Sequence, residues 1–179
     1  DELIDEDIDF IKLDTQGTEY DILGNAQKCL NSTLMVECEV EFFQVYKKQK
    51  LAHDIFEMMN NLGFELLYLN RIFGQSSYFK GESRGQIVFG DALFGISREK
   101  AINLEFRKKI KYIALLINYG HIDFAFDIYK NCPDLQMRLP KLKKFFNKNN
   151  SQKRVSKGLK ILVDKFIFFL LGNLLMKVN

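Results

Sequence analysis

Residues 8–23 read IDFIKLDTQGTEYDIL, and this stretch decides how the first half of the chain should fold. The apolar run at 8–13 predicts a short strand that ends at Asp14. Gly17 then allows a turn, and the residues after it predict a helix from about Thr18 to Leu30. A strand, a tight turn and a helix in this order indicate the start of a βα unit.

Several side chains in this stretch bear on function. Side chains alternate along a strand, so Phe10, Lys12 and Asp14 share one face. Asp14 stands at the carboxyl end of the strand, where parallel sheets bind ligands, although an aspartate at this place could equally serve only to cap a helix. Thr15 is another candidate cap, and Glu19 in the first helical turn suits the positive end of the helix dipole.

The alternation of strands and helices continues further along the chain. Strands are expected at 34–43, 64–70 and 86–96, and a helix at 51–62. Gly63 should end that helix. Strands joined by helices predict a parallel sheet. The last strand instead follows a polar loop at 71–85, so it should pair antiparallel in a hairpin, with a bulge at Gly90.

The second strand is unusually acidic, because Glu37, Glu39 and Glu41 alternate onto one of its faces. A central parallel strand is normally apolar on both faces, and burying an unpaired carboxylate costs several kcal/mol or shifts its pKa. This face is therefore either wet at its carboxyl end or neutralised by partners. Glu41, and then Glu39, are the best candidates for a cleft. An edge strand with one solvated face is the alternative.

Composition narrows the class of protein. The chain has 179 residues, of which 47% are hydrophobic and 27% charged, which fits one globular domain with an appendage. Its 17 Phe and 7 Tyr exclude disorder for most of the chain, and the lack of a long unbroken apolar run excludes a clean transmembrane helix. Cys29, Cys38 and Cys132 have no CxxC spacing and favour a reducing compartment. His53 and His121 are isolated, and neither a zinc-helix motif nor a phosphate-binding glycine motif is present.

Charge is distributed unevenly. Residues 1–41 hold 12 acids and 2 bases, whereas residues 136–179 hold 11 bases and 1 acid. The basic end should attract an anionic neighbour. The chain begins in an acidic stretch without an initiator Met, so we expect a fragment of a longer protein.

The second half should be helical from Arg98 onward. An apolar stripe marks its first long helix, at Ile110, Ile113, Ala114 and Ile117. Gly120 permits a turn into a second helix at 121–131. We therefore expect a helical hairpin at 98–135, followed by a basic and apolar helical tail at 136–179.

The tail has alternative interpretations. Residues 141–160 contain eight Lys or Arg and no acid, and 161–176 are mostly apolar, so 141–176 could bind an anionic membrane surface. A helix that packs on the fold or on a second subunit is equally plausible. Binding to nucleic acid is unlikely: Phe145 and Phe146 could stack on bases, but no nucleic-acid-binding motif is recognisable.

Three segments resemble the FkbM family of S-adenosylmethionine-dependent methyltransferases: residues 8–23, VECEVEFFQVY at 36–46 and GDALFGI at 90–96. The first segment contains a Lys-x-Asp-x-x-Gly-x-Glu pattern, at Lys12, Asp14, Gly17 and Glu19. The second matches at Glu39, Glu41, Phe42 and Tyr46. The resemblance covers about residues 1–97.

The resemblance implies an α/β fold. Residues 1–97 would form the C-terminal half of a class I, Rossmann-like methyltransferase sheet, its fourth to seventh strands with the last one antiparallel, and an all-α extension would follow. The glycine loop that cradles the cofactor has no counterpart here, so the chain alone is expected to be inactive. The full enzyme is expected to be cytoplasmic, with or without peripheral membrane attachment, and to methylate a hydroxyl of a glycan, sugar or small metabolite. A non-catalytic methyltransferase-like scaffold or interaction domain is the alternative.

The resemblance also implies roles for individual residues. The catalytic carboxylates would be Asp14, Glu19 and Glu41. The cofactor S-adenosylmethionine would be bound by Asp14, Gln16 and Gly17. The substrate would be bound by Lys12, Glu39 and Tyr46, although Lys12 could instead pair with a buried carboxylate. Asp14 and Glu41 could also hold Mg²⁺, which would lower the pKa of the acceptor hydroxyl.

Overall fold

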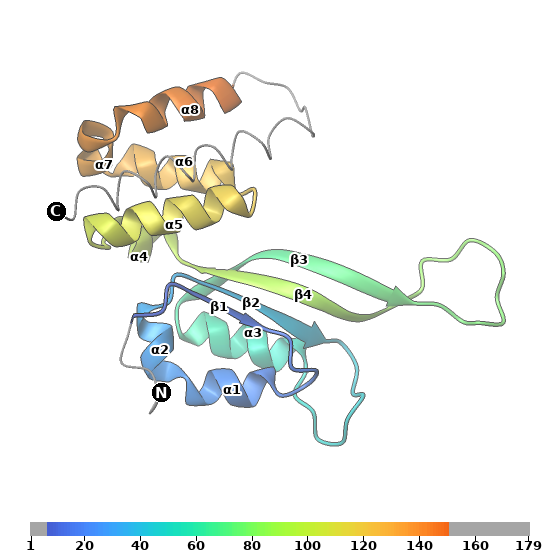
Figure 1. Ribbon diagram of the computed structural model, residues 1–179. Helices are drawn as coiled ribbons and strands as arrows, with labels where there is room; N and C mark the ends of the chain where they lie inside the picture. The colour runs from blue at the N-terminus through green and yellow to red at the C-terminus, as the bar shows by residue number, and fades with distance from the viewer. Residues whose placement is uncertain (1–6, 151–179) are drawn as a thin grey trace. The chain divides into compact units, whose positions relative to one another are not determined.

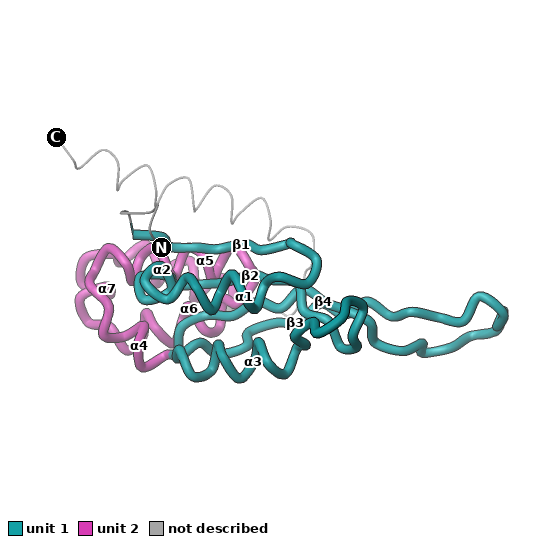
Figure 2. Tube along the Cα trace, turned by 90° about the horizontal axis from the view of Figure 1, so that it is seen from below, with its two compact units in different colours: residues 1–97 teal, residues 98–179 magenta. Residues whose placement is uncertain are grey.

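The structure is a computed structural model that describes residues 7–150. The chain divides into two compact units, Asp1–Ser97 and Arg98–Asn179 (Figure 2). Within the described residues, the first unit is a mixed α/β structure and the second is helical. No helix among residues 7–150 is both long and apolar enough to cross a bilayer.

The first unit is built on a four-stranded sheet. Its elements in chain order are β1 (Phe10–Leu13), α1 (Glu19–Asn25), α2 (Gln27–Ser32), β2 (Met35–Glu41), α3 (Ala52–Asn61), β3 (Phe64–Gly74) and β4 (Gln86–Ile96) (Figure 1). The strands lie in the order β1-β2-β4-β3. β1 and β2 are parallel, and β4 is antiparallel to both of its neighbours. The expected strands and the antiparallel last strand are confirmed, and the arrangement is compatible with a methyltransferase-like fold.

The position of β2 corrects one expectation. β2 lies between β1 and β4, so the alternative of an edge strand is wrong. Its apolar side chains Val36, Cys38 and Val40 are fully buried, and they lie on the face that α1 and α3 cover. Its glutamates alternate onto the opposite face, as the sequence pattern predicted.

The first helix is broken where the sequence predicted it to be continuous. α1 ends at Asn25, and α2 begins at Gln27 after Ala26, whose backbone is not helical (φ −104°, ψ 25°). Gly24 and Asn25 are poor helix formers, and the Asn25 side chain donates a hydrogen bond of 2.7 Å to the Asp21 carbonyl. The break therefore has a local cause.

The hairpin differs from expectation in two respects. β3 extends to Gly74, so the loop at its end is shorter than the predicted 71–85. The register between the strands shifts between Leu66 and Tyr68 and between Ile72 and Phe73, whereas Gly90 pairs regularly with Val40 and Arg71, so the bulge predicted at Gly90 is wrong. A Cβ atom at Gly90 would collide with the Asn70 carbonyl oxygen. Gly90 therefore permits a close approach of two backbones rather than a bulge.

The second unit contains five helices within the described residues. They are α4 (Arg98–Ile102), α5 (Phe106–Asn118), α6 (Ile122–Asn131), α7 (Pro133–Arg138) and α8 (Pro140–Asn150). α5 and α6 form the expected pair: Gly120 between them has φ +87°, and Ile110, Ile113 and Ile117 are buried. Ala114, the fourth residue of the predicted stripe, is only half-buried.

Part of the predicted tail packs inside this unit. Leu142, Phe145 and Phe146 of α8 are buried, and the Phe146 ring contacts Tyr129 and Phe145 with centroid distances of 5.4 and 5.5 Å. These phenylalanines are therefore not available to stack on nucleic-acid bases. The rest of the tail, 151–179, lies outside the described residues, and the division into three domains stays a prediction.

Candidate active site

The turn after β1 is organised by the side chain of Glu19. Its Oε1 atom accepts hydrogen bonds from the Thr15 N–H at 2.7 Å and the Thr15 hydroxyl at 2.9 Å, and Oε2 accepts one from the Gly17 N–H at 2.8 Å. Gln16 and Gly17 have φ of +56° and +107°, a left-handed turn that favours glycine. The carboxylate satisfies the backbone groups that this turn leaves without partners.

These hydrogen bonds describe the positions of Glu19 and Thr15 in the turn. Glu19 is only 1% exposed, and both of its oxygens point at the turn, which favours a supporting role over the catalytic role predicted for it. Thr15 is not the N-cap of α1: that position is Thr18, whose side chain makes no capping bond. Thr15 instead donates to Glu19 and accepts a 2.9 Å hydrogen bond from the Thr18 hydroxyl.

Asp14 follows β1 directly and is exposed at the carboxyl end of the strand, as predicted. Lys12, on the same face of β1, forms a 2.7 Å ion pair with Glu37 of β2. Lys12 thus pairs with a carboxylate, although Glu37 is half-buried rather than buried as expected. Its hydrogen bond with Glu37 raises the pKa of Lys12, and Glu37 is neutralised in return.

Glu39 has acidic neighbours, whereas Glu37 is paired with a lysine. Every charged side chain that shifts the pKa of Glu39 is a carboxylate. Glu39 is half-buried and lies directly opposite Asp91 of β4. Burial raises the pKa of Glu39, and the negative charges of Asp14, Glu19 and Asp91 raise it further. The carboxyl edge of the sheet therefore carries a surplus of negative charge.

Glu41 is more deeply placed than the sequence suggested. It is only 5% exposed, so it lies in the protein interior rather than in an open cleft. Burial raises the pKa of Glu41, the charges of Glu19 and Glu39 raise it further, and the Gln49 side-chain amide lowers it. This placement does not favour direct contact between Glu41 and a substrate.

Gln49 links the turn after β1 to the loop after β2, and the sequence pattern did not identify this residue. Its Oε1 atom accepts hydrogen bonds from the N–H groups of Val45 and Tyr46 at 2.9 and 3.0 Å. Its buried Nε2 atom has no well-formed hydrogen bond among the described residues. A Cβ atom at Gly17 would lie 2.6 Å from this nitrogen and 3.2 Å from Cδ2 of Tyr46. The turn after β1 and the loop after β2 are therefore in contact.

Residues 1–66 match the family model of the methyltransferase FkbM domain. The resemblance to the FkbM family is confirmed over these residues, whereas the third resembling segment, at 90–96, lies outside the match. No curated protein and no solved structure matches the chain. The matched residues include the turn after β1, the acidic strand β2 and Gln49, so the site described above lies within the FkbM segment.

The metal site predicted in this FkbM segment has no support. Among residues 7–150, no three His, Cys, Asp or Glu side chains form a group that could hold a metal ion. Asp14, Glu19 and Glu41 thus do not meet as an oxygen-rich site, because Glu19 faces the turn and Glu41 is buried.

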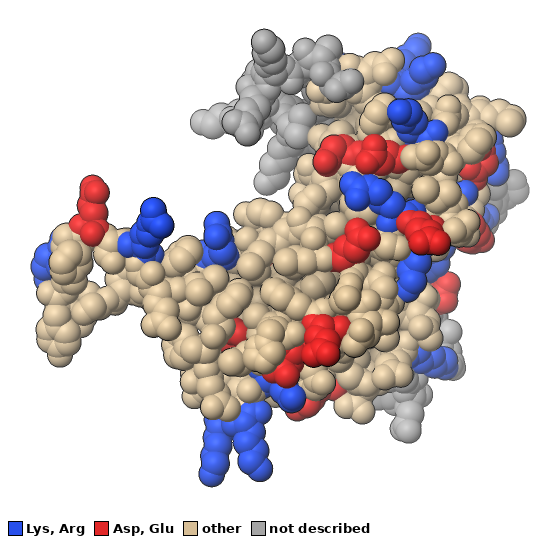
Figure 3. Space-filling model, turned by 180° about the vertical axis from the view of Figure 1, so that it is seen from behind, with Lys and Arg blue, Asp and Glu red and all other residues tan. Residues whose placement is uncertain are grey.

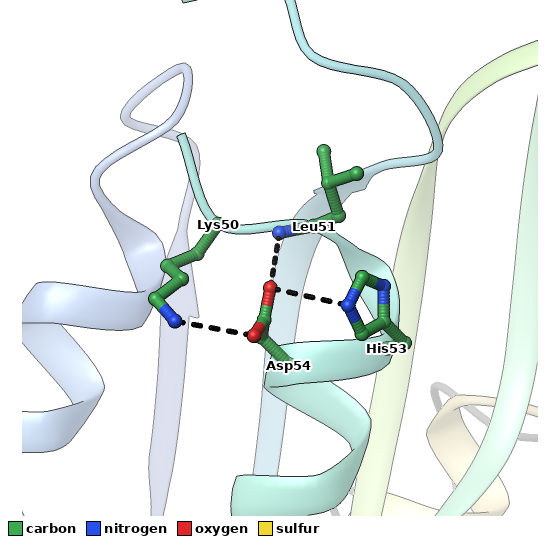
Figure 4. A network of polar contacts seen from close by, with 4 residues as sticks. All are labelled: Lys50, Leu51, His53 and Asp54. Atoms are coloured by element: carbon green, nitrogen blue, oxygen red, sulfur yellow. Dashed lines mark hydrogen bonds and ion pairs between the residues drawn. The ribbon is translucent and has the colours of Figure 1, made fainter. Parts of the chain in front are cut away.

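A groove of about 390 Å³ lies between α1 and α3, away from these residues. Asp54 on its rim accepts hydrogen bonds from the Leu51 N–H at 2.9 Å and from Lys50 at 3.2 Å, and His53 lies 3.6 Å from it (Figure 4). The Lys50 ammonium also lies 5.0 Å from the ring centre of Tyr20. These contacts stabilise the start of α3, and no predicted site residue lines the groove.

The cysteines and histidines differ in their surroundings. Cys29, Cys38 and Cys132 are all buried free thiols. Burial is the main reason that the pKa of Cys38 rises to about 12, so this thiol is not a nucleophile at neutral pH. His53 is exposed on the surface, and burial lowers the pKa of His121.

Proposed function

We propose that this chain contributes to an S-adenosylmethionine-dependent O-methyltransferase whose acceptor is a hydroxyl of a sugar or small metabolite. The FkbM match carries the methyltransferase class. The choice of donor and acceptor is supported by the surplus of carboxylates at the carboxyl edge of the sheet, where α/β folds bind ligands. A donor that carries a positive charge suits such an edge, and a carboxylate suits a hydroxyl that must lose a proton.

The residues present fit one side of such a site. Asp14 and Gln16 are exposed at the turn after β1, and Gly17 lets the backbone approach closely. These three residues would contact the cofactor, which supplies a methyl group activated on a sulfonium sulfur. These contacts are proposed for one side of the cofactor only.

Proton removal is assigned to Asp14. Its carboxylate is exposed at the edge, whereas Glu19 is occupied by the turn and Glu41 is buried. Asp14 would accept a hydrogen bond from the acceptor hydroxyl, align its oxygen and take its proton. Glu39 and Tyr46 flank this place and are proposed to bind the rest of the acceptor, since Tyr46 is 54% exposed beside Gly17.

The test compares Asp14→Asn with Asp21→Asn, a matched change at an exposed aspartate of α1, in the full-length protein. We expect the first variant to lose methyl transfer from labelled S-adenosylmethionine while its thermal midpoint stays within a few degrees. Asp21→Asn should keep both. Equal activity of the two variants would remove Asp14 from the mechanism. Failure of the unmodified protein to bind S-adenosylmethionine would favour the scaffold alternative.

A further inference from the structure

Residues 71–88, which we call the arm, form the outer part of the β3–β4 hairpin. β4 pairs with β2 only between Phe89 and Gly95, so the earlier part of β4 pairs with β3 alone. The hairpin consequently extends past the end of the remaining sheet (Figures 1 and 2). A two-stranded ribbon has no second layer on which to bury its side chains.

Four large apolar side chains of the arm are exposed. Tyr78 is 95% exposed and Phe79 60%, and Ile72 and Phe73 are 40% and 46% exposed. The Phe79 ring lies beside Gly81, where an added Cβ atom would be 2.8 Å from the ring. Exposed aromatic and aliphatic side chains gathered in one short segment make the arm a candidate interaction site.

Hydrogen bonds order the tip that carries the two most exposed rings. The Phe79 N–H donates to the Ser76 carbonyl at 3.2 Å, which closes a turn around Tyr78. The Gln75 side-chain amide donates to the Ser83 carbonyl at 3.0 Å and joins the two sides of the loop. Because the loop is already ordered, less conformational entropy is lost when the rings are buried.

The charge of the arm indicates the chemistry of its partner. The arm contains Arg71, Lys80 and Arg84 but a single acid, Glu82. Basic side chains stand out from the surface of the arm in Figure 3. Basic residues next to exposed aromatic rings are typical of segments that bind anionic bilayers, where the rings enter the headgroup region and the cations contact lipid phosphates.

The size of the patch favours a bilayer over a folded protein partner. Two aromatic side chains bury roughly 300–500 Å² when fully covered, whereas a stable protein interface needs about 800 Å² on each partner. A narrow ribbon tip presents little further surface to a partner of fixed shape. A fluid bilayer adapts to a narrow tip, so a small aromatic patch can insert without a preformed groove.

We propose that the arm docks on an anionic lipid surface, with Tyr78 and Phe79 in the headgroup region and Lys80 and Arg84 on lipid phosphates. The arm leaves the sheet at the carboxyl end of β2, where Glu41 pairs with Phe89. Docking would therefore bring the edge of the proposed catalytic site toward the bilayer. The docking itself does not depend on the proposed function.

The sequence allows a direct test, because the chain contains no tryptophan. Tyr78→Trp places the sole indole at the tip, and Tyr68→Trp, at a 58% exposed position on β3 outside the arm, is the matched control. With phosphatidylserine-containing vesicles we expect the emission of the first variant to shift to shorter wavelength and to be quenched by brominated lipid. The control should not respond, and vesicles of pure phosphatidylcholine should give a much weaker response.

Charge variants test the second half of the proposal. In the Tyr78→Trp background, Lys80→Gln with Arg84→Gln should weaken vesicle partitioning roughly 30-fold, since each basic residue near an anionic surface contributes about one factor of five in affinity. Circular dichroism should be unchanged, because both side chains are exposed. The proposal would be overturned if anionic vesicles left the Tyr78→Trp emission unchanged. It would also be overturned if only the Tyr68→Trp control showed a shift in emission. An equal shift with soluble polyglutamate would assign the arm to an acidic protein instead.

Discussion

Removing the Glu19 carboxylate should unfold the turn after β1 while leaving the strands nearby intact. Glu19→Ala leaves two backbone N–H groups and one hydroxyl without the acceptor that they have at 2.7–2.9 Å. A hydrogen bond to a charged group contributes about 1.5–3 kcal/mol. Water can reach the exposed side of the turn, so we expect a loss of about 3–4 kcal/mol rather than the full sum.

The amide variant separates charge from shape. Glu19→Gln keeps Oε1 for both bonds from Thr15, but its NH₂ group faces the Gly17 N–H, so one of three bonds is replaced by a contact between donors. We expect a loss of about 1–2 kcal/mol. The matched control is Glu57→Gln, at an exposed glutamate of α3, which should change stability by less than about 0.5 kcal/mol.

The assay combines urea unfolding with amide hydrogen exchange, because the chain has two units and a single midpoint could mix them. Exchange at Thr15 and Gly17 should accelerate more than exchange at Leu23, which is fully buried in α1. The order of stability should be unmodified protein, then Gln, then Ala. If both Glu19 variants matched the Glu57 control, the supporting role assigned to this carboxylate would be refuted.

Three other changes probe the same region. Glu41→Gln should stabilise the fold at neutral pH, because burial raises the pKa of Glu41 and ionisation of this carboxyl therefore disfavours the folded state. Below about pH 4, the pKa in the unfolded chain, the carboxyl is protonated in both states. The stability gain of the variant, measured by urea titration, should disappear there. Gly17→Ala should lower the free energy of unfolding by about 1–3 kcal/mol in thermal unfolding, since Gly17 has a left-handed φ of +107° and the added methyl would meet a side chain at 2.6 Å. Its control is Gly24→Ala, at a helical position with no neighbouring atom within 4 Å, which should stabilise the fold by about 0.5–1 kcal/mol. Gln49→Ala should accelerate amide exchange at Tyr46 by removing its acceptor, and protection as strong as in the unmodified protein would contradict the role assigned to Gln49 in holding the loop after β2.

Most of the first unit could be predicted from the sequence, because its strands follow simple periodic patterns. The glutamates of β2 alternate against a fully apolar face, and Gly63 ends α3 with φ +79°, as expected. The hairpin at β4 followed from the absence of a helix before it. These features depend on local pattern alone, which is what periodicity detects.

Features that depend on distant contacts could not be predicted in this way. Glu41 is buried at the end of β2. In the loop that follows, Gln49 accepts hydrogen bonds from the backbone N–H groups of Val45 and Tyr46. No periodic signal marks a glutamine with this role. The additional helices of the second unit were predictable in principle, since Pro133 and Pro140 stand at the first positions of α7 and α8, where proline is favoured.

The acidic strand links the fold to the proposed function. Glu37 is neutralised by Lys12, whereas the charged neighbours that shift the pKa of Glu39 are all carboxylates. Ionising such a group in the folded protein is unfavourable, and a nearby cation would relieve that cost. A site that only had to be stable would replace Glu39 with a neutral residue or pair it with a lysine, as β2 does two residues earlier. The acidic surroundings of Glu39 therefore suit a cationic ligand at this place, and the methyl donor proposed above carries its positive charge on the sulfonium sulfur next to the methyl group.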